Sequence, residues 1–189
     1  MTSAYQIFFI FNMSTLAITF IGNLFISQHY GRGHLDQIEF DTYLLLKASI
    51  ILSLVFTILC AAIPQQIMSV FVLGVEDIEV KEEVIRYGAQ YLQIFSASFI
   101  FTGVTMIYYC VMKNVKMEKN VVFNSAYCLV LDILLTAIFV YGLKLGVRGV
   151  ALALVLARIV ECVSAIAIEN VKGYIHFHWK HTPIHPCKR

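Results

Sequence analysis

Five long stretches of the chain are apolar and almost free of charged side chains. They cover residues 1–31, 48–75, 87–112, 120–143 and 149–168. The first three contain no Asp, Glu, Lys or Arg, the fourth contains only Asp132, and the fifth contains only Arg158 and Glu161. Because about 20 apolar residues in a helix span a bilayer and a charge in mid-span is costly, this pattern predicts five transmembrane helices. The expected fold class is an all-α, polytopic membrane protein.

Turn-forming residues mark the ends of the first two predicted helices. We expect the first helix at about residues 4–28, followed by Gly31 and Gly33, because glycine favours the end of a helix. The second helix is expected at about residues 43–63, and Pro64 ends it.

Two shorter stretches lie between the predicted spans. Residues 34–42 alternate acidic and apolar side chains, which is typical of an amphipathic segment at the membrane interface. Residues 65–73 are apolar but too short to span, so we expect them to lie in the interface or to re-enter the membrane. The acidic run at residues 76–83 should open the third helix, since carboxylates suit the positive end of a helix dipole, and that helix should continue to about Met112.

The second half of the chain forms a predicted pair of helices and a tail. After a basic connector at residues 113–119, we expect a helix at about residues 120–141 and a last helix that ends near Ile168. We assign residues 1–171 to one transmembrane lobe. The chain shows no helical period from Glu169 onward, and residues 172–189 form a cytoplasmic tail or a non-native linker.

Composition and charge support this assignment. Hydrophobic residues make up 59% of the chain and charged residues 14%. In globular proteins apolar residues average roughly 45–50% and charged residues about 25%. A net charge of +2 without a basic stripe argues against nucleic acid as a partner. Eight Lys and Arg follow the first, third and fifth spans and four lie on the other side, so the N-terminus should face outward. We expect an integral protein of the cell (plasma or inner) membrane.

The sequence contains no motif that indicates an enzyme. There is no P-loop, no His-Glu-x-x-His, no Gly-x-Ser-x-Gly and no dinucleotide fingerprint. The tail contains side chains that can bind transition metals, namely His176, His178, His181, His185 and Cys187. Because such a tract is only a compositional signal, we expect no metal site, no cofactor and no catalytic activity.

Asp132 is the most informative polar residue in the predicted spans. It lies near the middle of the fourth span, and Asn124, Cys128 and Thr136 fall on the same helical stripe. A carboxylate at that depth must be protonated, paired or bound to a cation, and each of these states can be linked to transport. The alternative is a structural carboxyl group that bonds a neighbouring helix. We take Asp132, Asn124 and Thr136 as candidates for ion or proton coupling.

Other polar residues repeat at helical spacing on the first three spans. Small hydroxyl and amide side chains commonly join transmembrane helices, so helix contact is the favoured interpretation of each stripe. The members that we keep as candidates for a substrate cavity are Asn12, Thr19, Tyr91, Ser98 and Thr102. Arg158 and Glu161, which are spaced to meet on one helix face, are interpreted as a structural pair.

Three segments resemble the multidrug and toxic compound extrusion (MATE) family of transporters. Ile26-Ser-Gln-His-Tyr-Gly31 resembles the end of the family's second helix, and Tyr91-Leu-Gln-Ile94 resembles the start of its fourth. Leu145-Gly-Val-Arg-Gly-Val-Ala-Leu-Ala153 resembles the opening of its sixth helix and is the most specific match. The chain therefore looks like helices two to six of the family's N-terminal six-helix lobe.

The resemblance implies a function for the intact transporter. It would be a secondary antiporter that exports organic, often cationic, compounds in exchange for Na⁺ or H⁺, with Asp132 as the coupling group. The expected partners are the bilayer, a small organic substrate, and the missing first helix and C-terminal lobe. The alternatives are a lipid-linked oligosaccharide flippase of the same superfamily, and a non-transporting membrane protein or inert fragment.

Overall fold

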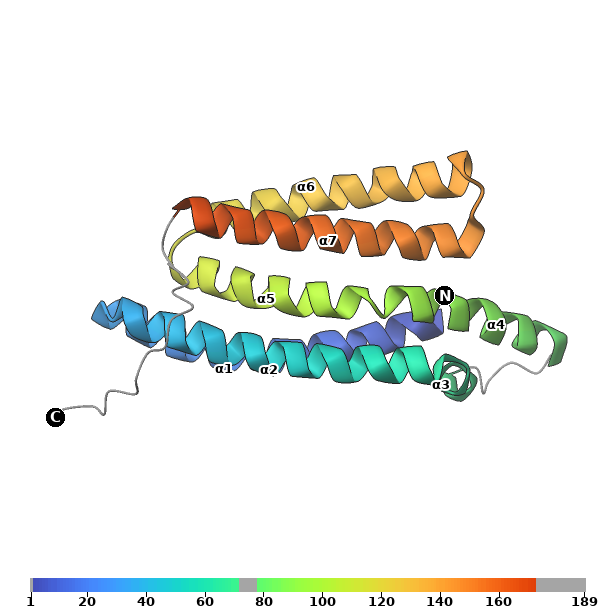
Figure 1. Cartoon of the computed structure of the whole chain (residues 1–189), viewed down its shortest axis with the longest axis horizontal. Helices are drawn as coiled ribbons and strands as arrows, with labels where there is room; N and C mark the ends of the chain where they lie inside the picture. Colours follow the sequence, from blue (N-terminus) through green and yellow to red (C-terminus); the bar gives the residue numbers. More distant parts are fainter. Residues whose placement is uncertain (1, 72–77, 173–189) are drawn as a thin grey trace.

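The computed structural model describes residues 2–71 and 78–172, and every element in these ranges is helical. The elements are α1 (Thr2–Arg32), α2 (Leu35–Ala62), α3 (Pro64–Phe71), α4 (Ile78–Phe95), α5 (Ser98–Asn114), α6 (Glu118–Ala137), the π-helix η1 (Ile138–Gly142) and α7 (Gly146–Lys172). The long helices lie side by side, and α3 runs across one end of the bundle (Figure 1).

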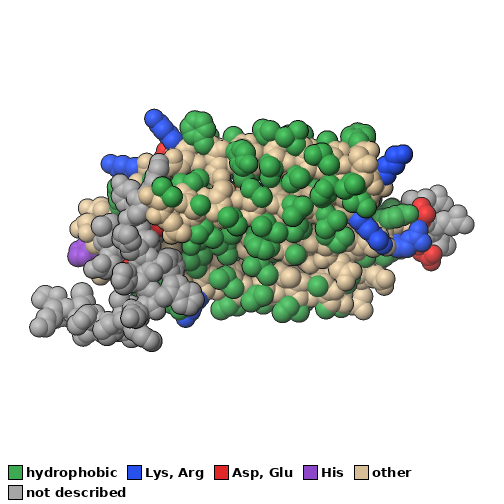
Figure 2. Space-filling view, turned by 45° about the horizontal axis from the view of Figure 1, so that its top comes forward, with side chains coloured by type: hydrophobic (Ala, Val, Ile, Leu, Met, Phe, Trp, Pro, Cys, Tyr) green, Lys and Arg blue, Asp and Glu red, His purple; other side chains and the backbone are tan. Residues whose placement is uncertain are grey.

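The long helices have the dimensions of membrane spans. Among the described residues, four helical segments are long and apolar enough to cross a bilayer, and the bent α4–α5 pair makes a fifth when it is counted as one span. Apolar side chains cover the middle of the molecule, and the charged side chains gather at its two ends (Figure 2). The predicted all-α, polytopic membrane protein is confirmed, and the five predicted spans agree with the upper count.

Connectors alternate between the two ends of the bundle. The turns after α1 and α5 lie at one end, and the turns after α2 and η1 lie at the other (Figure 1). Helix α1 ends just before Gly33, as expected. Gly33 has φ +75°, a backbone conformation that L side chains rarely adopt and that glycine adopts easily. Which end faces the cytoplasm stays a prediction from the Lys and Arg asymmetry.

We predicted that the third span would be one helix continuing to Met112. The structure shows instead two helices, α4 and α5. The span breaks between Phe95 and Ser98, and its two halves are bent by 47°. The hydroxyls of Ser96 and Ser98 donate to the carbonyls of Gln93 and Phe95, both at 2.7 Å. Such local bonds compete with the helical ladder.

A neighbouring helix stabilises this break. The Thr57 hydroxyl on α2 donates to the Ser96 carbonyl at 3.1 Å, which satisfies an acceptor at the bend. Aromatic rings surround the bend, with centroid separations from 4.6 Å for Phe11 and Phe99 to 6.5 Å for Phe8 and Phe99. The bend is therefore embedded in packed side chains.

The segments between the spans also differ from expectation in part. Residues 34–42 do not form a separate interfacial segment, because α2 already begins at Leu35. Its first turns are held to α1 by His29 Nδ1 and Asp41 Oδ2, which are 2.6 Å apart. The short segment after Pro64 is helical, and its Met68 is 1% exposed. Residues 72–77 and 173–189, with the His-rich tail, lie outside the described residues.

Helix α5 occupies the centre of the bundle. It packs against α1 and α2 on one side and against α6 and α7 on the other, as Figure 1 shows. Its residues Ile107, Val111 and Met112 are at most 1% exposed. The polar side chains that point from the neighbouring helices toward α5 are therefore held inside the molecule.

Candidate functional site

A polar network lies where α5, α6 and α7 meet. The Tyr109 hydroxyl of α5 donates to Oε1 of Glu161 on α7 at 3.0 Å. The same hydroxyl accepts a hydrogen bond of 2.9 Å from the Asn124 amide of α6. The three side chains are 6–8% exposed. They belong to three helices, so their alignment depends on how all three helices pack.

Two residues of α7 complete the network. Ser164 donates to the Asn124 amide oxygen at 2.7 Å, and the Asn124 amide also reaches the backbone carbonyl of Glu161 at 3.4 Å. Arg158 pairs with Oε2 of Glu161 one turn away on the same helix. The donor and acceptor capacity of Asn124 is thus used within the network, and the Glu161 carboxylate is bound on both oxygens. We call Tyr109, Asn124, Arg158, Glu161 and Ser164 the junction network.

Asp132 lies beside the junction network without being bonded into it. It is half-buried, and its Oδ1 atom is enclosed with no hydrogen-bond partner among the described residues. The charges of Arg158 and Glu161 act on it electrostatically. With both carboxyl groups ionised, the three side chains carry one excess negative charge. A site with one excess negative charge inside a membrane favours the uptake of one monovalent cation.

The stripe on α6 divides into two parts. Asn124 lies two turns from Asp132, about 12 Å along the helix axis, and is engaged by Tyr109 and Ser164. Thr136 is half-buried one turn beyond Asp132. The structure therefore joins Asn124 to the Arg158–Glu161 pair, and leaves Asp132 and Thr136 as neighbours along one helix face.

The candidates for a substrate cavity lie mostly inside helix contacts. The buried members are Thr19 (7% exposed), Tyr91 (7%), Ser98 (0%) and Thr102 (4%). Asn12 is half-buried and donates to the Phe8 carbonyl of its own helix at 2.8 Å. Thr19 also lines a hollow on α1. The structure places Asn12 and Thr19 on α1, Tyr91 on α4, and Ser98 and Thr102 on α5.

The contact between α2 and α5 is close-packed and uncharged. A Cβ atom added to Gly103 would lie 2.3 Å from the Ser53 hydroxyl and 2.8 Å from that of Ser49. Ser49 and Ser53 are fully buried, and their hydroxyls and that of Thr102 have no hydrogen-bond partner among the described residues. Helix contact was the favoured interpretation of the polar stripes, and at Ser49 and Ser53 on α2 the structure shows a close contact with Gly103 of α5.

Sequence reasoning missed two members of the junction network. Ser164 could have been found, since it lies one turn after Glu161 and close to its helical face. Tyr109 gave no signal, because it stands beside Tyr108 in an apolar span and only the rotation of α5 decides which hydroxyl meets α6 and α7.

Residues 1–138 match a family model described as MatE. The match covers more than half of the 189 residues and takes in α1 to α6, with Asn124 and Asp132. Arg158, Glu161 and Ser164 lie beyond it. No curated protein and no solved structure matches the chain.

Proposed function

We propose, since this chain belongs to the MatE family of membrane transporters, that it acts in a secondary antiporter for organic, often cationic, compounds. The exchanged ion would be Na⁺ or H⁺. Membership of the family and the apolar helices make the chain an integral membrane protein of a transporter family. The substrate class and the ion coupling are our inference.

The observation that carries the proposal is the enclosed, unbonded Oδ1 atom of Asp132. A carboxylate oxygen enclosed in a membrane span without a partner is costly, and a proton or a cation can relieve that cost. Beside it, Arg158 is held by Glu161 and does not close the Asp132 site. Asp132 is therefore a group at which a proton or Na⁺ would change the charge of the lobe, with Thr136 as its neighbour; Glu169 near the end of α7 also has an enclosed, unbonded oxygen.

Cation binding at Asp132 could drive exchange only through a difference in affinity between two conformations. The junction network joins α6 to α5 and α7, so a change in charge on α6 can alter how these helices pack. In one conformation the cation would neutralise Asp132. In the other conformation Arg158 would neutralise Asp132, because the Arg158 charge already acts on this carboxyl group.

We further propose that export needs a second lobe. Alternating access moves two repeats about a shared site, and the described residues form one bundle. The second lobe could belong to a longer chain, a second polypeptide or a second copy. A flippase for phosphate-bearing lipids would favour a cationic cavity, whereas Arg158, the one Arg in the five charge-poor stretches of the sequence, is paired with Glu161.

The test measures cation binding by the 189-residue chain in lipid nanodiscs. We expect Na⁺ or a fall in pH to raise the melting temperature of the wild type, and Asp132→Asn to abolish this response while the protein stays folded. Infrared difference spectra across pH should lose a carboxyl band in the same variant. Glu118→Gln, at the exposed start of the same helix, is the matched control.

Transport is then measured in proteoliposomes that hold the complete transporter. Cation-driven uptake and its pH dependence should be lost in Asp132→Asn and kept in Glu118→Gln. If a well-folded Asn variant keeps both the cation response and the transport, Asp132 is a structural carboxyl group and the coupling proposal is wrong.

A further inference from the structure

The Glu169 side chain is a buried carboxyl group outside the junction network. It lies in the last turn of α7, at the end of the bundle that holds the turn from α5 into α6 (Figure 1). It is 3% exposed, and its Oε1 atom is enclosed without a hydrogen-bond partner among the described residues. An ionised carboxylate in this position would be costly, because neither water nor a bonded partner relieves its charge.

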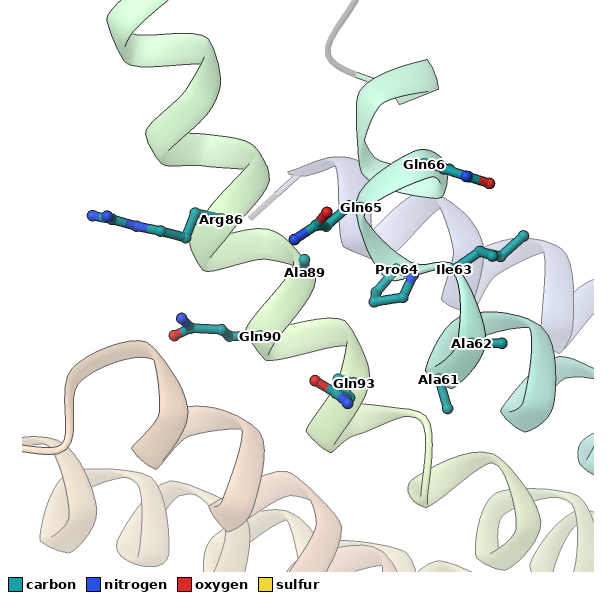
Figure 3. A pocket seen from close by; sticks show the side chains of 10 residues that line it. All are labelled: Ala61, Ala62, Ile63, Pro64, Gln65, Gln66, Arg86, Ala89, Gln90 and Gln93. Atoms are coloured by element: carbon teal, nitrogen blue, oxygen red, sulfur yellow. The ribbon is translucent and has the colours of Figure 1, made fainter.

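The polar side chains around the hollow at the opposite end of the bundle are arranged differently. This hollow, of about 390 Å³, lies between the α2–α3 turn and α4. Figure 3 shows Arg86 and Gln90 pointing away from Gln65 and from that turn, so these groups do not converge on one ligand. The Arg86 side chain is 62% exposed, so water can solvate its charge. Glu169, by contrast, is enclosed by packed helices.

The helix face that carries Glu169 packs into apolar side chains. Ala165, one turn earlier on this face, is 0% exposed and belongs to a buried cluster with Met112 and Val115 of α5. On α5, Glu169 acts electrostatically on the Tyr108 hydroxyl, which is itself buried. Among the side chains that the structure describes, no Lys, Arg or His forms an ion pair with Glu169.

The other titratable groups of the helices that pack on α7 are engaged elsewhere or exposed. Two turns earlier on α7, Glu161 is bound by Arg158 and Tyr109. The Cys110 thiol of α5 donates to groups of α1. Helices α4 and η1 pack against the start of α7 rather than its end. The charged side chains on α5, on α6 and in their connecting turn at this end are all exposed: Lys113, Lys116, Glu118 and Lys119.

We propose that Glu169 is a second proton-binding site, separate from Asp132, and that its proton holds the end of α7 against α5. A proton needs a single oxygen, which Oε1 offers, whereas a metal cation needs several oxygen ligands at once. The protonated carboxyl is neutral and stays between apolar helices at a lower cost than the carboxylate. Loss of the proton would place an unpartnered charge in the α5–α7 contact and loosen it. The proposal does not depend on the role of Asp132.

The first test is infrared spectroscopy of the 189-residue chain in lipid nanodiscs at neutral pH. Exposed Asp and Glu side chains are ionised at this pH, so the band of a protonated carboxyl reports a buried one. We expect Asp132→Asn to keep such a band, and the double variant Asp132→Asn with Glu169→Gln to lose it. Glu118→Gln, an exposed glutamate at the same end, is the matched control in the Asp132→Asn background and should keep the band.

Two spectroscopic results overturn the proposal. One is the absence of the band in Asp132→Asn, and the other is its persistence in the double variant. Neither result bears on ion coupling at Asp132, which its own cation response and transport assay decide. The two proposals therefore fail separately.

The second test asks whether the proton holds the helices together. Between neutral and alkaline pH, the melting temperature of the wild type should fall by several degrees more than that of Glu169→Gln. The reason is that loss of the proton charges Glu169 in the folded bundle, whereas glutamine has no proton to lose. At neutral pH the two proteins should melt at similar temperatures, because glutamine is neutral and of the same size.

Glu169→Met, which is similar in length and has no amide to satisfy, should behave as Glu169→Gln does. If Glu169 were instead a carboxylate paired with a cation, both variants would melt well below the wild type at neutral pH. That result, or an equal fall of melting temperature with pH in the wild type and both variants, overturns the proposal.

Discussion

The two sides of α5 accommodate polar side chains in opposite ways. Toward α2, Gly103 meets the hydroxyls of Ser49 and Ser53, and these hydroxyls have no hydrogen-bond partner among the described residues. Toward α6 and α7, Tyr109 enters a network that binds both oxygens of the Glu161 carboxylate. The α2–α5 contact depends on small side chains, and the contact of α5 with α6 and α7 depends on polar groups that hydrogen-bond one another.

Polar side chains in a transmembrane span therefore have two distinct roles. A hydroxyl is small enough to let two backbones approach, so it suits close packing. A carboxylate or guanidinium is so costly in hydrocarbon that it must have partners or a cation. The charged side of α5 is therefore where chemistry is expected, and the hydroxyl side is where the bundle is held together.

The largest expected effect comes from removing the acceptor of the junction network. Glu161→Leu leaves Arg158 and Tyr109 without their shared partner, and the free energy of unfolding should fall by about 3 kcal/mol. Reversible denaturation in mixed micelles measures this loss. The double variant Arg158→Met with Glu161→Leu should lose less than the single variant, because no unpaired charge remains. A larger loss in the double variant would contradict the network.

The next effect tests close packing on the other side. Gly103→Ala places a methyl group against the Ser53 hydroxyl and should destabilise the bundle by about 2 kcal/mol. Adding Ser53→Ala should recover part of this loss. Gly31→Ala is the control, since a Cβ there meets nothing within 4 Å. An equal response of both glycines would mean that the α2–α5 contact is not tight.

A smaller effect separates two adjacent tyrosines. Tyr109→Phe removes the hydroxyl that joins Asn124 to Glu161, and stability should fall by about 1 kcal/mol. Tyr108 is buried to the same extent but lies outside the junction network, so Tyr108→Phe should change stability less. Thermal melting in detergent compares the two variants. The reverse order would mean that α5 is rotated relative to the structure.

The smallest effect is expected for the hydroxyls on the α2 side. Ser49→Ala and Ser53→Ala remove oxygen atoms without hydrogen-bond partners, so each should change the free energy of unfolding by less than about 0.5 kcal/mol. The same denaturation assay applies. A loss above about 1 kcal/mol would show that these hydroxyls are bonded, and the contrast between the two sides of α5 would disappear.

Much of the fold could be predicted from the order of residues. The charge-free stretches, Gly33 and Pro64 locate the spans and their ends, because burying a charge in hydrocarbon is costly wherever the helix packs. The break near Ser96 could not be predicted, since its serines resemble others in the same helices. It depends on Thr57 of α2, which meets the break only in the folded bundle.

The candidate site shows the same division. The mid-span position of Asp132 and the shared helix face of Arg158 and Glu161 follow from local spacing alone, so both could be predicted. The link from Asn124 to Glu161 through Tyr109, and the unbonded oxygen of Asp132, became visible in the folded bundle. Hydropathy places a residue at a depth in the membrane, whereas packing against the neighbouring helices sets the rotation and register of each helix, and these select the side chains that meet at that depth.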